Sequence, residues 1–158
     1  MENVRFTVVP LGEEHVHEAA ALEGECFSDG VSPQAFAAFA LGGSSRYFAA
    51  LDEAGCVIGY GGFSHAADEA EILTVAVAQA FRRRGVARML LDRMLTESRA
   101  LGAENVYLEV RASNTAAQAL YSRAGFHVIG TRKNYYAHPR EDAVLMHLGP
   151  AGGEGLEC

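Results

Sequence analysis

The chain has 158 residues, of which 49% are hydrophobic and 21% are charged, and its formal net charge at pH 7 is −7. This length and composition fit a globular domain with a buried core and exclude a disordered chain. The acidic balance disfavours general binding of nucleic acid and favours a cationic substrate or partner.

The first half of the chain predicts one strand, two helices and a β-hairpin. Apolar residues recur at helical spacing after the first strand, and Pro33 suits the first position of the second helix. The polar run Asp52–Gly55 lies between two apolar stretches, which is typical of a hairpin turn. In chain order, the predicted elements are strand 5–9, helix 13–26, helix 33–41, strand 46–51 and strand 56–65.

The second half predicts a strand–helix–strand crossover, followed by a helix and two strands. Strand 105–111 alternates apolar and polar residues, and Ser113 or Asn114 is suited to cap the helix that follows. The long helix is expected to carry on one face Ala87, Leu90, Leu91, Met94, Ser98 and Leu101. The predicted elements are strand 69–77, helix 84–101, strand 105–111, helix 115–123, strand 126–131 and strand 143–148.

This order of elements predicts the fold class. A crossover from strand 69–77 to strand 105–111 places these two strands parallel, whereas hairpins place theirs antiparallel. We therefore expect an α/β fold with a mixed sheet and helices on both of its faces. The elements form a single predicted domain over residues 1–148, and residues 149–158 are expected to form a flexible Gly-rich tail.

A basic turn lies between strand 69–77 and the long helix. Its residues are Arg82, Arg83, Arg84, Gly85, Val86 and Ala87. The free N–H groups of a first helical turn attract anions, and glycine lets the backbone approach a ligand closely. The turn is therefore a candidate phosphate site, and the alternative interpretation is a solvated basic helix cap. Neither a P-loop nor a dinucleotide-binding glycine pattern is present.

Several other classes of site and location are disfavoured. The three cysteines have no metal-ligand or disulfide spacing, and we expect Cys26 and Cys56 to be buried and Cys158 to be exposed. The six histidines are scattered, so no metal site is expected, and no nucleophile elbow of a hydrolase occurs. Because no apolar run is as long as the roughly 20 residues of a membrane helix and no signal peptide is evident, a cytoplasmic location without a membrane partner is expected.

Several motifs resemble a known enzyme family. The basic turn Arg82–Ala87 is similar to the pyrophosphate-binding signature of the Gcn5-related N-acetyltransferases. Within that superfamily, four runs resemble the RimI-type ribosomal-protein-alanine N-acetyltransferases, with the resemblance covering roughly residues 69–148: Leu108–Asn114, Ala119–Phe126, Arg132–Tyr136, and Arg140–Ala143 with Met146. It implies an acyl-CoA N-acyltransferase fold, with a mostly antiparallel sheet of about seven strands. It also implies direct, metal-free transfer of the acetyl group of acetyl-CoA to the N-terminal alanine of a small-subunit ribosomal protein.

The resemblance assigns the chemistry to two residues. Glu109 matches the general base that takes the proton of the amine, and Tyr121 matches the acid that serves the departing thiolate. Glu71, on the preceding strand, is a rival base and a candidate for the acceptor side. The alternatives are a structural ion pair, in which Glu109 faces Arg111, and a packing role for the Tyr121 ring.

The remaining expected site residues bind the two substrates. The backbone of Val75 and Val77 would hold the pantetheine arm, the turn Arg82–Ala87 would hold the pyrophosphate, and Asn114 would cap a helix, bind pantetheine or do both. Tyr135 and Tyr136 would lead to the acceptor, unless they are core aromatics. The segment Phe27–Pro33 departs from the family pattern, which leaves the acceptor open: another protein N-terminus or a small amine is the alternative, and a non-catalytic acetyl-CoA sensor is a further one.

Overall fold

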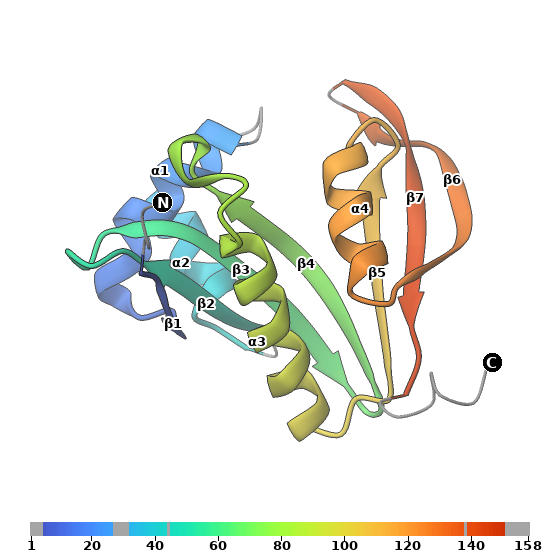
Figure 1. Ribbon diagram of the computed structural model, residues 1–158, viewed down its shortest axis with the longest axis horizontal. Coiled ribbons are helices and arrows are strands. Elements are labelled where there is room, and N and C mark those ends of the chain that lie inside the picture. The colour runs from blue at the N-terminus through green and yellow to red at the C-terminus, as the bar shows by residue number, and fades with distance from the viewer. Residues whose placement is uncertain (1–4, 27–31, 44, 138, 151–158) are drawn as a thin grey trace. The chain divides into compact units, whose positions relative to one another are not determined.

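The computed structural model describes residues 5–26, 32–43, 45–137 and 139–150 (Figure 1). Within them, seven strands form one hydrogen-bonded sheet in the order β1-β2-β3-β4-β5-β7-β6, which confirms the predicted fold class. The strands are β1 Thr7–Pro10, β2 Ser45–Leu51, β3 Val57–Ala66, β4 Glu69–Val77, β5 Asn105–Arg111, β6 His127–Ala137 and β7 Arg140–Leu148. The helices are η1 Glu13–His15, α1 Val16–Cys26, α2 Pro33–Ala40, η2 Gln79–Phe81, α3 Val86–Ala100 and α4 Thr115–Arg123.

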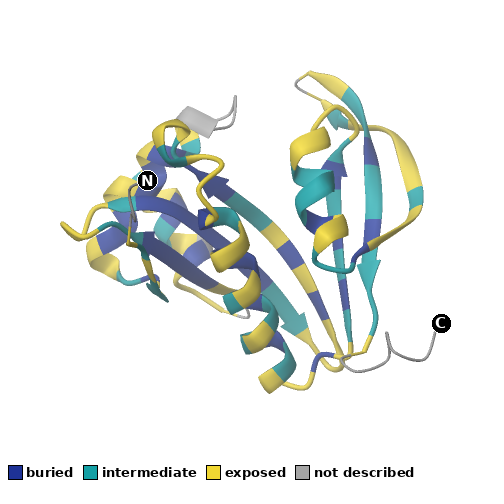
Figure 2. Ribbon diagram, viewed as in Figure 1, coloured by how far each residue is buried: buried dark blue, intermediate teal, exposed yellow. Residues whose placement is uncertain are grey.

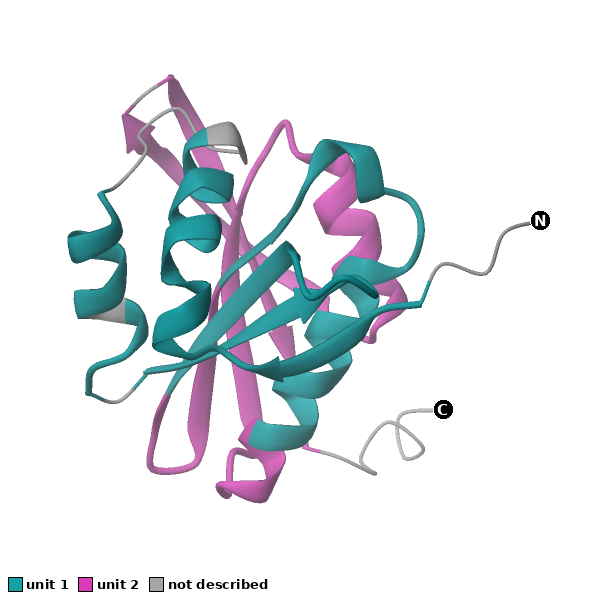
Figure 3. Cartoon of the chain, turned by 90° about the vertical axis from the view of Figure 1, so that its left-hand side faces the viewer, with its two compact units in different colours: residues 1–64, 74–97 teal, residues 65–73, 98–158 magenta. Residues whose placement is uncertain are grey.

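The chain divides into two compact units (Figure 3). The first unit comprises residues 1–64 and 74–97, and the second comprises residues 65–73 and 98–158. Strand β4 belongs to the second unit in its first half and to the first unit in its second half. The prediction of a single domain over residues 1–148 stays a prediction.

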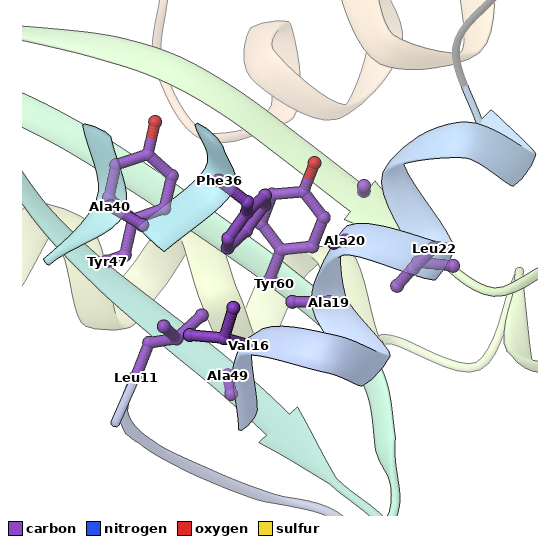
Figure 4. Close-up of a cluster of buried hydrophobic side chains, with 11 residues drawn as sticks. Leu11, Val16, Ala19, Ala20, Leu22, Phe36, Ala40, Tyr47, Ala49 and Tyr60 are labelled. Carbon is purple, nitrogen blue, oxygen red and sulfur yellow. The ribbon is translucent and has the colours of Figure 1, made fainter. Parts of the chain in front are cut away.

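In the first unit, one face of the sheet packs against α1 and α2. Alternate residues of β2 and β3 point to this face, where Tyr47, Ala49 and Tyr60 join the side chains of the two helices (Figure 4). The Phe36 ring contacts the Tyr60 ring edge-on, with ring centroids 5.1 Å apart. Ser32 caps α2 by accepting a hydrogen bond from the N–H of Ala35 at 3.1 Å, and Pro33 occupies the first turn as predicted.

The opposite face of the same strands packs against α3. A Cβ atom on Gly59 would lie 2.9 Å from the Ala76 carbonyl oxygen and 3.3 Å from Leu90, and one on Gly61 would lie 2.9 Å from Met94. Glycine at these two positions therefore lets α3 approach the strand backbone closely. Helices cover both faces of the sheet in this unit, as the sequence predicts.

The buried face of α3 differs from the prediction at its end. Its fully buried residues are Val86, Leu90, Leu91, Met94 and Ser98. Leu101 is 36% exposed, so its assignment to this face is wrong. The helix ends at Ala100, and Leu101 lies in the turn that leads to Gly102, whose φ of +100° closes the helix.

The second unit is built around β5. Its first neighbour, β4, pairs with it in parallel, with Glu71 beside Tyr107 and Ile72 beside Leu108, as the crossover predicts. Residues of β5 alternate between buried and half-buried along the whole strand (Figure 2). Tyr121 of α4 packs its ring edge-on against Phe126, with centroids 5.7 Å apart. The half-buried face of β5 is therefore the one whose polar side chains can meet a ligand.

Strands β6 and β7 are longer than predicted, because bulges hide the alternation of β6. One extra residue lies between Val128 and Gly130, and a larger irregularity separates Arg132 from Tyr136. Within the second bulge Asn134 has a φ of +53°, and its N–H donates a hydrogen bond to Asp142 Oδ1 at 2.8 Å. The Asn134–Tyr136 run therefore lies within a strand rather than after it.

Two further expectations concern the cysteines and the membrane. Cys56 is exposed, and the prediction that it is buried is wrong, since it follows the hairpin turn and its N–H donates to Asp52 Oδ1 at 2.9 Å. The Cys26 side chain and Cys158 lie outside what the structure describes, as do residues 27–31 and most of the predicted tail. Among the described helices, none combines the length and the apolar character needed to cross a bilayer.

Candidate functional site

The basic turn of the first unit has a backbone conformation that suits an anion. Arg83 and Gly85 both have positive φ, at +66° and +87°. The Gly85 carbonyl accepts the N–H of Met89 at 3.0 Å, so the helical hydrogen bonds start here. The N–H groups of the first turn of α3 have no acceptor within the helix, and they can serve an external anion.

The arginine side chains of this turn contact their own neighbours. Arg82 Nε donates to the Val77 carbonyl at 3.0 Å, and the Arg84 guanidinium lies 5.8 Å from the centre of the Phe81 ring. All three arginines are exposed, whereas Val86 is 1% exposed and anchors the start of α3 in the core. A Cβ on Gly85 would meet no protein atom within 4 Å, so the need for glycine there comes from its φ.

The predicted pantetheine-binding residues lie at the end of β4, also in the first unit. Val75 is half-buried and Val77 is buried. The Val77 carbonyl accepts the Arg82 hydrogen bond, so one of the backbone groups predicted to hold pantetheine is already engaged. Ala87 is half-buried and follows Val86 in the first turn of α3.

The second unit contains a shallow pocket of about 300 Å³ on the half-buried face of β5. The strand register places Glu71 beside Tyr107 and Glu109 opposite Leu145. The lining residues are Glu71, Tyr107, Leu108, Glu109, Ile129, Arg132, Leu145 and Met146. Two carboxylates from adjacent strands thus share a pocket with one guanidinium.

Glu71 is electrostatically linked to the other charges of this pocket. Partial removal of water raises the pKa of Glu71, the negative charge of Glu109 raises it further, and the positive charge of Arg132 acts in the opposite direction. A carboxylate with a raised pKa is a better proton acceptor near neutral pH. Glu71 therefore has the electrostatic character of a base and stays a rival to Glu109.

Glu109 has two polar partners, Arg132 and Tyr135. Neither of them is Arg111, the partner that the sequence suggests. Arg132 Nε lies 3.6 Å from Glu109 Oε2, and hydrogen bonding to Glu109 is the main cause that raises the pKa of Tyr135. The alternative of an ion-paired strand carboxylate therefore holds with Arg132, and not Arg111, as the partner of Glu109. Arg111 Nη1 instead lies 3.4 Å from Glu141 Oε1, and its guanidinium lies 4.3 Å from the centre of the Tyr136 ring.

Tyr121 lies in α4 with its side chain buried. Burial raises the pKa of Tyr121 to about 12, and the nearby hydroxyl of Tyr136 adds to this effect. The hydroxyl is therefore protonated throughout the neutral range. The ring also packs on Phe126, so the packing role and the predicted acid role are compatible.

Asn114 and the two tyrosines of β6 have defined surroundings. Asn114 Oδ1 accepts the N–H of Ala117 at 3.1 Å, which confirms Asn114 rather than Ser113 as the cap of α4. Tyr135 is 46% exposed and Tyr136 is half-buried, so the interpretation of both as core aromatics is wrong. Their rings are nearly perpendicular, with centroids 5.1 Å apart.

The residue that the sequence reasoning missed is Arg132. It belongs to the segment that carries the family resemblance, but no role followed from its position. Because β7 lies between β5 and β6, the contact between Arg132 and Glu109 reaches across a whole strand. The bulges of β6 set the register that brings them together, and no local sequence pattern reports it.

The predicted site residues thus fall into two groups. Glu71, Glu109, Tyr121, Asn114, Tyr135 and Tyr136 belong to the second unit, while Val75, Val77 and the turn Arg82–Ala87 belong to the first. Within the second unit, Glu71 and Glu109 line one pocket and Tyr135 contacts Glu109. Across the described ranges, no three His, Cys, Asp or Glu side chains cluster in a way that could hold a metal ion.

Comparisons with known proteins agree with this fold and these motifs. The ribosomal protein bS18-alanine N-acetyltransferase of Salmonella typhimurium is 47% identical over 83 residues, a match that spans 51% of this chain and only 56% of that enzyme. The N-alpha-acetyltransferase RimI of Mycobacterium tuberculosis is 35% identical over 89% of this chain and 90% of its own length. The crystal structure of the Escherichia coli ribosomal-protein-S18-alanine N-acetyltransferase superposes with a TM-score of 0.82 at 30% identity, covering 92% of this chain and 94% of that one.

The sequence model of one family also matches most of the chain. It is described as the acetyltransferase (GNAT) family, and it matches residues 16–126. This range includes the basic turn, both pocket carboxylates and α4 with Tyr121. The chain belongs to the acetyltransferase (GNAT) family.

Proposed function

We propose that this protein transfers the acetyl group of acetyl-CoA to the α-amine at a protein N-terminus. The observation that carries the proposal is the pocket of the second unit, in which Glu71 and Glu109 lie together and Arg132 is their cationic neighbour. Two carboxylates in one pocket suit an incoming ammonium group and the removal of its proton. The names of the relatives in Salmonella typhimurium and Mycobacterium tuberculosis support the same reaction.

The proposed binding of acetyl-CoA rests mainly on backbone groups. The first turn of α3 and the turn Arg82–Gly85 would hold the pyrophosphate through N–H groups, supported by the helix dipole. Val75 and Val77 would hydrogen-bond the pantetheine amides through their main chain. The side-chain amide of Asn114 would contribute a further donor, because its oxygen is engaged in capping.

The proposed reaction is a direct transfer. Only a neutral amine is nucleophilic, and an α-amino group has a pKa of about 7.7–8.0, so a modest base is sufficient. Glu109 takes one proton from the bound ammonium group, directly or through a water, and the neutral nitrogen then attacks the thioester carbonyl carbon. The second N–H proton leaves the tetrahedral adduct and ends on the released thiolate or in solvent. The C–N bond forms, the C–S bond breaks, and the electron pair leaves on the CoA sulfur.

Tyr121 would serve the leaving thiolate. With a pKa of about 12, its hydroxyl is a weaker acid than a thiol, whose ordinary pKa is about 8.5. Complete proton transfer to sulfur is therefore uphill, and the main contribution of Tyr121 is a hydrogen bond that stabilises the developing negative charge. The same high pKa keeps the donor protonated across the neutral and mildly basic range in which the amine becomes reactive.

The proposed acceptor is the N-terminal alanine of a small-subunit ribosomal protein in the cytoplasm. Ribosomal proteins are basic, and the net charge of −7 favours a cationic partner. Two of the relatives carry this substrate in their names. The segment that departs from the family pattern, residues 27–31, lies outside the described residues and adds nothing to this choice.

The decisive test is a panel of acceptors incubated with acetyl-CoA and analysed by mass spectrometry. Peptides that begin with Ala or Ser, followed by Arg, are expected to be acetylated on the α-amine. Matched peptides with Gln in place of Arg should react more slowly, and the difference should shrink at high salt. Preferential acetylation of internal lysines, or of a polyamine over every peptide, would contradict the N-terminal acceptor. No transfer to any amine would contradict the enzyme proposal itself.

A further inference from the structure

The pocket of the second unit holds an unbalanced set of charges. Glu71 and Glu109 contribute two carboxylates, and Arg132 contributes one guanidinium. The Glu109 side chain is 20% exposed, so its charge is partly desolvated and gains from a nearby cation. Without Arg132 the two carboxylates would repel each other with no compensating charge among the residues that line the pocket.

Arg132 is held in this position only weakly. Its side chain is 60% exposed, and the 3.6 Å between Arg132 Nε and Glu109 Oε2 exceeds the length of a good charged hydrogen bond. The guanidinium also lies 5.7 Å from the centre of the exposed Tyr135 ring. Ion pairs this exposed contribute little to stability, so Arg132 can leave Glu109 for solvent at little cost.

Resting on the proposed function, we propose that Arg132 is a resident counter-ion that the α-ammonium group of the acceptor displaces. The acceptor brings one positive charge to the carboxylates as Arg132 withdraws one. Binding therefore exchanges one cation for another, and the carboxylate pair keeps one cation beside it until Glu109 takes the proton of the amine. Neutral ligands cannot replace the guanidinium, so this exchange selects for a cationic amine.

The exchange lowers the affinity of the protein for the acceptor, and this loss can be measured. Arg132 competes with the acceptor for Glu109, so its removal should strengthen acceptor binding. It also makes binding less dependent on salt, because the charge of the pocket changes little when one cation replaces another. A residue that merely supports the fold would produce neither effect, and a residue that binds the acceptor would produce the opposite one.

The test compares Arg132→Gln with Arg132→Lys and Lys133→Gln. Lys133 is the adjacent exposed cation of β6 and does not line the pocket, so Lys133→Gln makes the same change in net charge outside the site. For an alanine-initiated peptide, Arg132→Gln should lower KM about two- to fivefold and steepen its salt dependence, with a much smaller change in kcat. Arg132→Lys should restore most of the wild-type KM, and Lys133→Gln should leave it unchanged.

The opposite results would overturn the inference. A higher KM in Arg132→Gln would mean that Arg132 contacts the acceptor. Equal KM values in Arg132→Gln and Lys133→Gln would mean that the effect comes from the net charge of the protein and not from the position of Arg132. Calorimetric binding of the same peptide, with CoA in place of acetyl-CoA, makes the comparison without turnover. Absence of transfer by the wild type would thus contradict the proposed function, whereas tighter peptide binding by Arg132→Gln would still support the displacement.

Discussion

The basic turn of the first unit and the carboxylate pocket of the second differ in the atoms they offer. The turn Arg82–Gly85 and the start of α3 offer backbone N–H groups, whose positions depend on φ values at Arg83 and Gly85. The pocket offers the side-chain carboxylates of Glu71 and Glu109, and burial and neighbouring charges set the pKa of Glu71. A site made of backbone tolerates changes of side chain, whereas a site made of carboxylates does not.

This contrast fits the division of chemical work in the proposed reaction. A pyrophosphate is an invariant part of the cofactor, and a fixed set of N–H groups at a helix N-terminus is sufficient to bind it. Proton transfer needs a group whose pKa is adjusted to the task, and only side chains provide one. The two sites should therefore respond in opposite ways to conservative replacement of side chains.

The largest expected effect comes from Glu109→Gln. This change keeps the shape of the side chain and removes its charge, so turnover should fall about 10²–10⁴-fold while acetyl-CoA binding stays nearly intact. Steady-state kinetics with an alanine-initiated peptide measures it. Glu69→Gln is the matched control, because Glu69 is an exposed carboxylate of β4 outside the pocket. Full activity of Glu109→Gln across pH 6–9, together with an inactive Glu71→Gln, would move the base to Glu71.

The second-largest expected effect concerns Gly85, in the backbone site of the basic turn. Acetyl-CoA at about 100 times its Kd should stabilise the native protein by about 2.7 kcal/mol, and Gly85→Glu should abolish the associated rise in Tm by placing a charge beside the pyrophosphate. Gly85→Ala should cost about 1 kcal/mol of stability, because its φ is +87°, and should keep part of the response.

Gly55 provides the control for this pair of variants. Its φ is +86°, and a Cβ there would also meet no protein atom within 4 Å. Gly55→Glu should therefore lower stability through its backbone alone and leave the response to acetyl-CoA unchanged. An unchanged response in Gly85→Glu as well would remove the basis for a phosphate site in this turn.

The contrast between the turn and the pocket also explains which features of the structure could be predicted from the sequence. Strand β5 and helix α4 have the predicted bounds, because alternation and capping are local properties of a few residues. The basic turn could likewise be found from its own residues. Leu101 and Cys56 were misplaced, since the end of α3 and the surroundings of a hairpin turn depend on where the backbone turns.

The pocket was less accessible to sequence reasoning. Glu71 and Glu109 could be placed on adjacent strands, but their common neighbour Arg132 comes from a strand that is not adjacent to β5. That contact depends on two irregularities in β6, where extra residues shift the register. A register shift of one residue turns side chains to the other face of a sheet, and no propensity scale reports it.

A smaller effect is expected on the pH dependence of stability, and it involves two buried tyrosines, one in each unit. Burial raises the pKa of Tyr47 and of Tyr121 to about 12, whereas an unfolded chain ionises its tyrosines near 10. Between these values the folded state binds more protons, so the free energy of unfolding falls as pH rises from 10 towards 12. At pH 11 each tyrosine should account for about 1.4 kcal/mol of this loss.

Urea unfolding at pH 9 and pH 11 measures this loss. Tyr121→Phe and Tyr47→Phe should each reduce it by that amount, and a single transition that responds to both variants would support the predicted single domain. Two transitions, each sensitive to one variant, would contradict it. An undiminished loss in Tyr121→Phe would contradict the high pKa assigned to its hydroxyl.

The smallest effect separates two roles of Asn114. Its side-chain oxygen caps α4, so Asn114→Ala should cost about 1 kcal/mol in stability by urea unfolding. Asn114→Ser keeps a capping oxygen and should retain most of that stability, but it removes the amide group proposed to donate to pantetheine. One lost hydrogen bond of about 0.5–1.5 kcal/mol should raise the Kd for acetyl-CoA about two- to tenfold in both variants. If Asn114→Ser binds acetyl-CoA as tightly as the wild type, Asn114 is a helix cap alone.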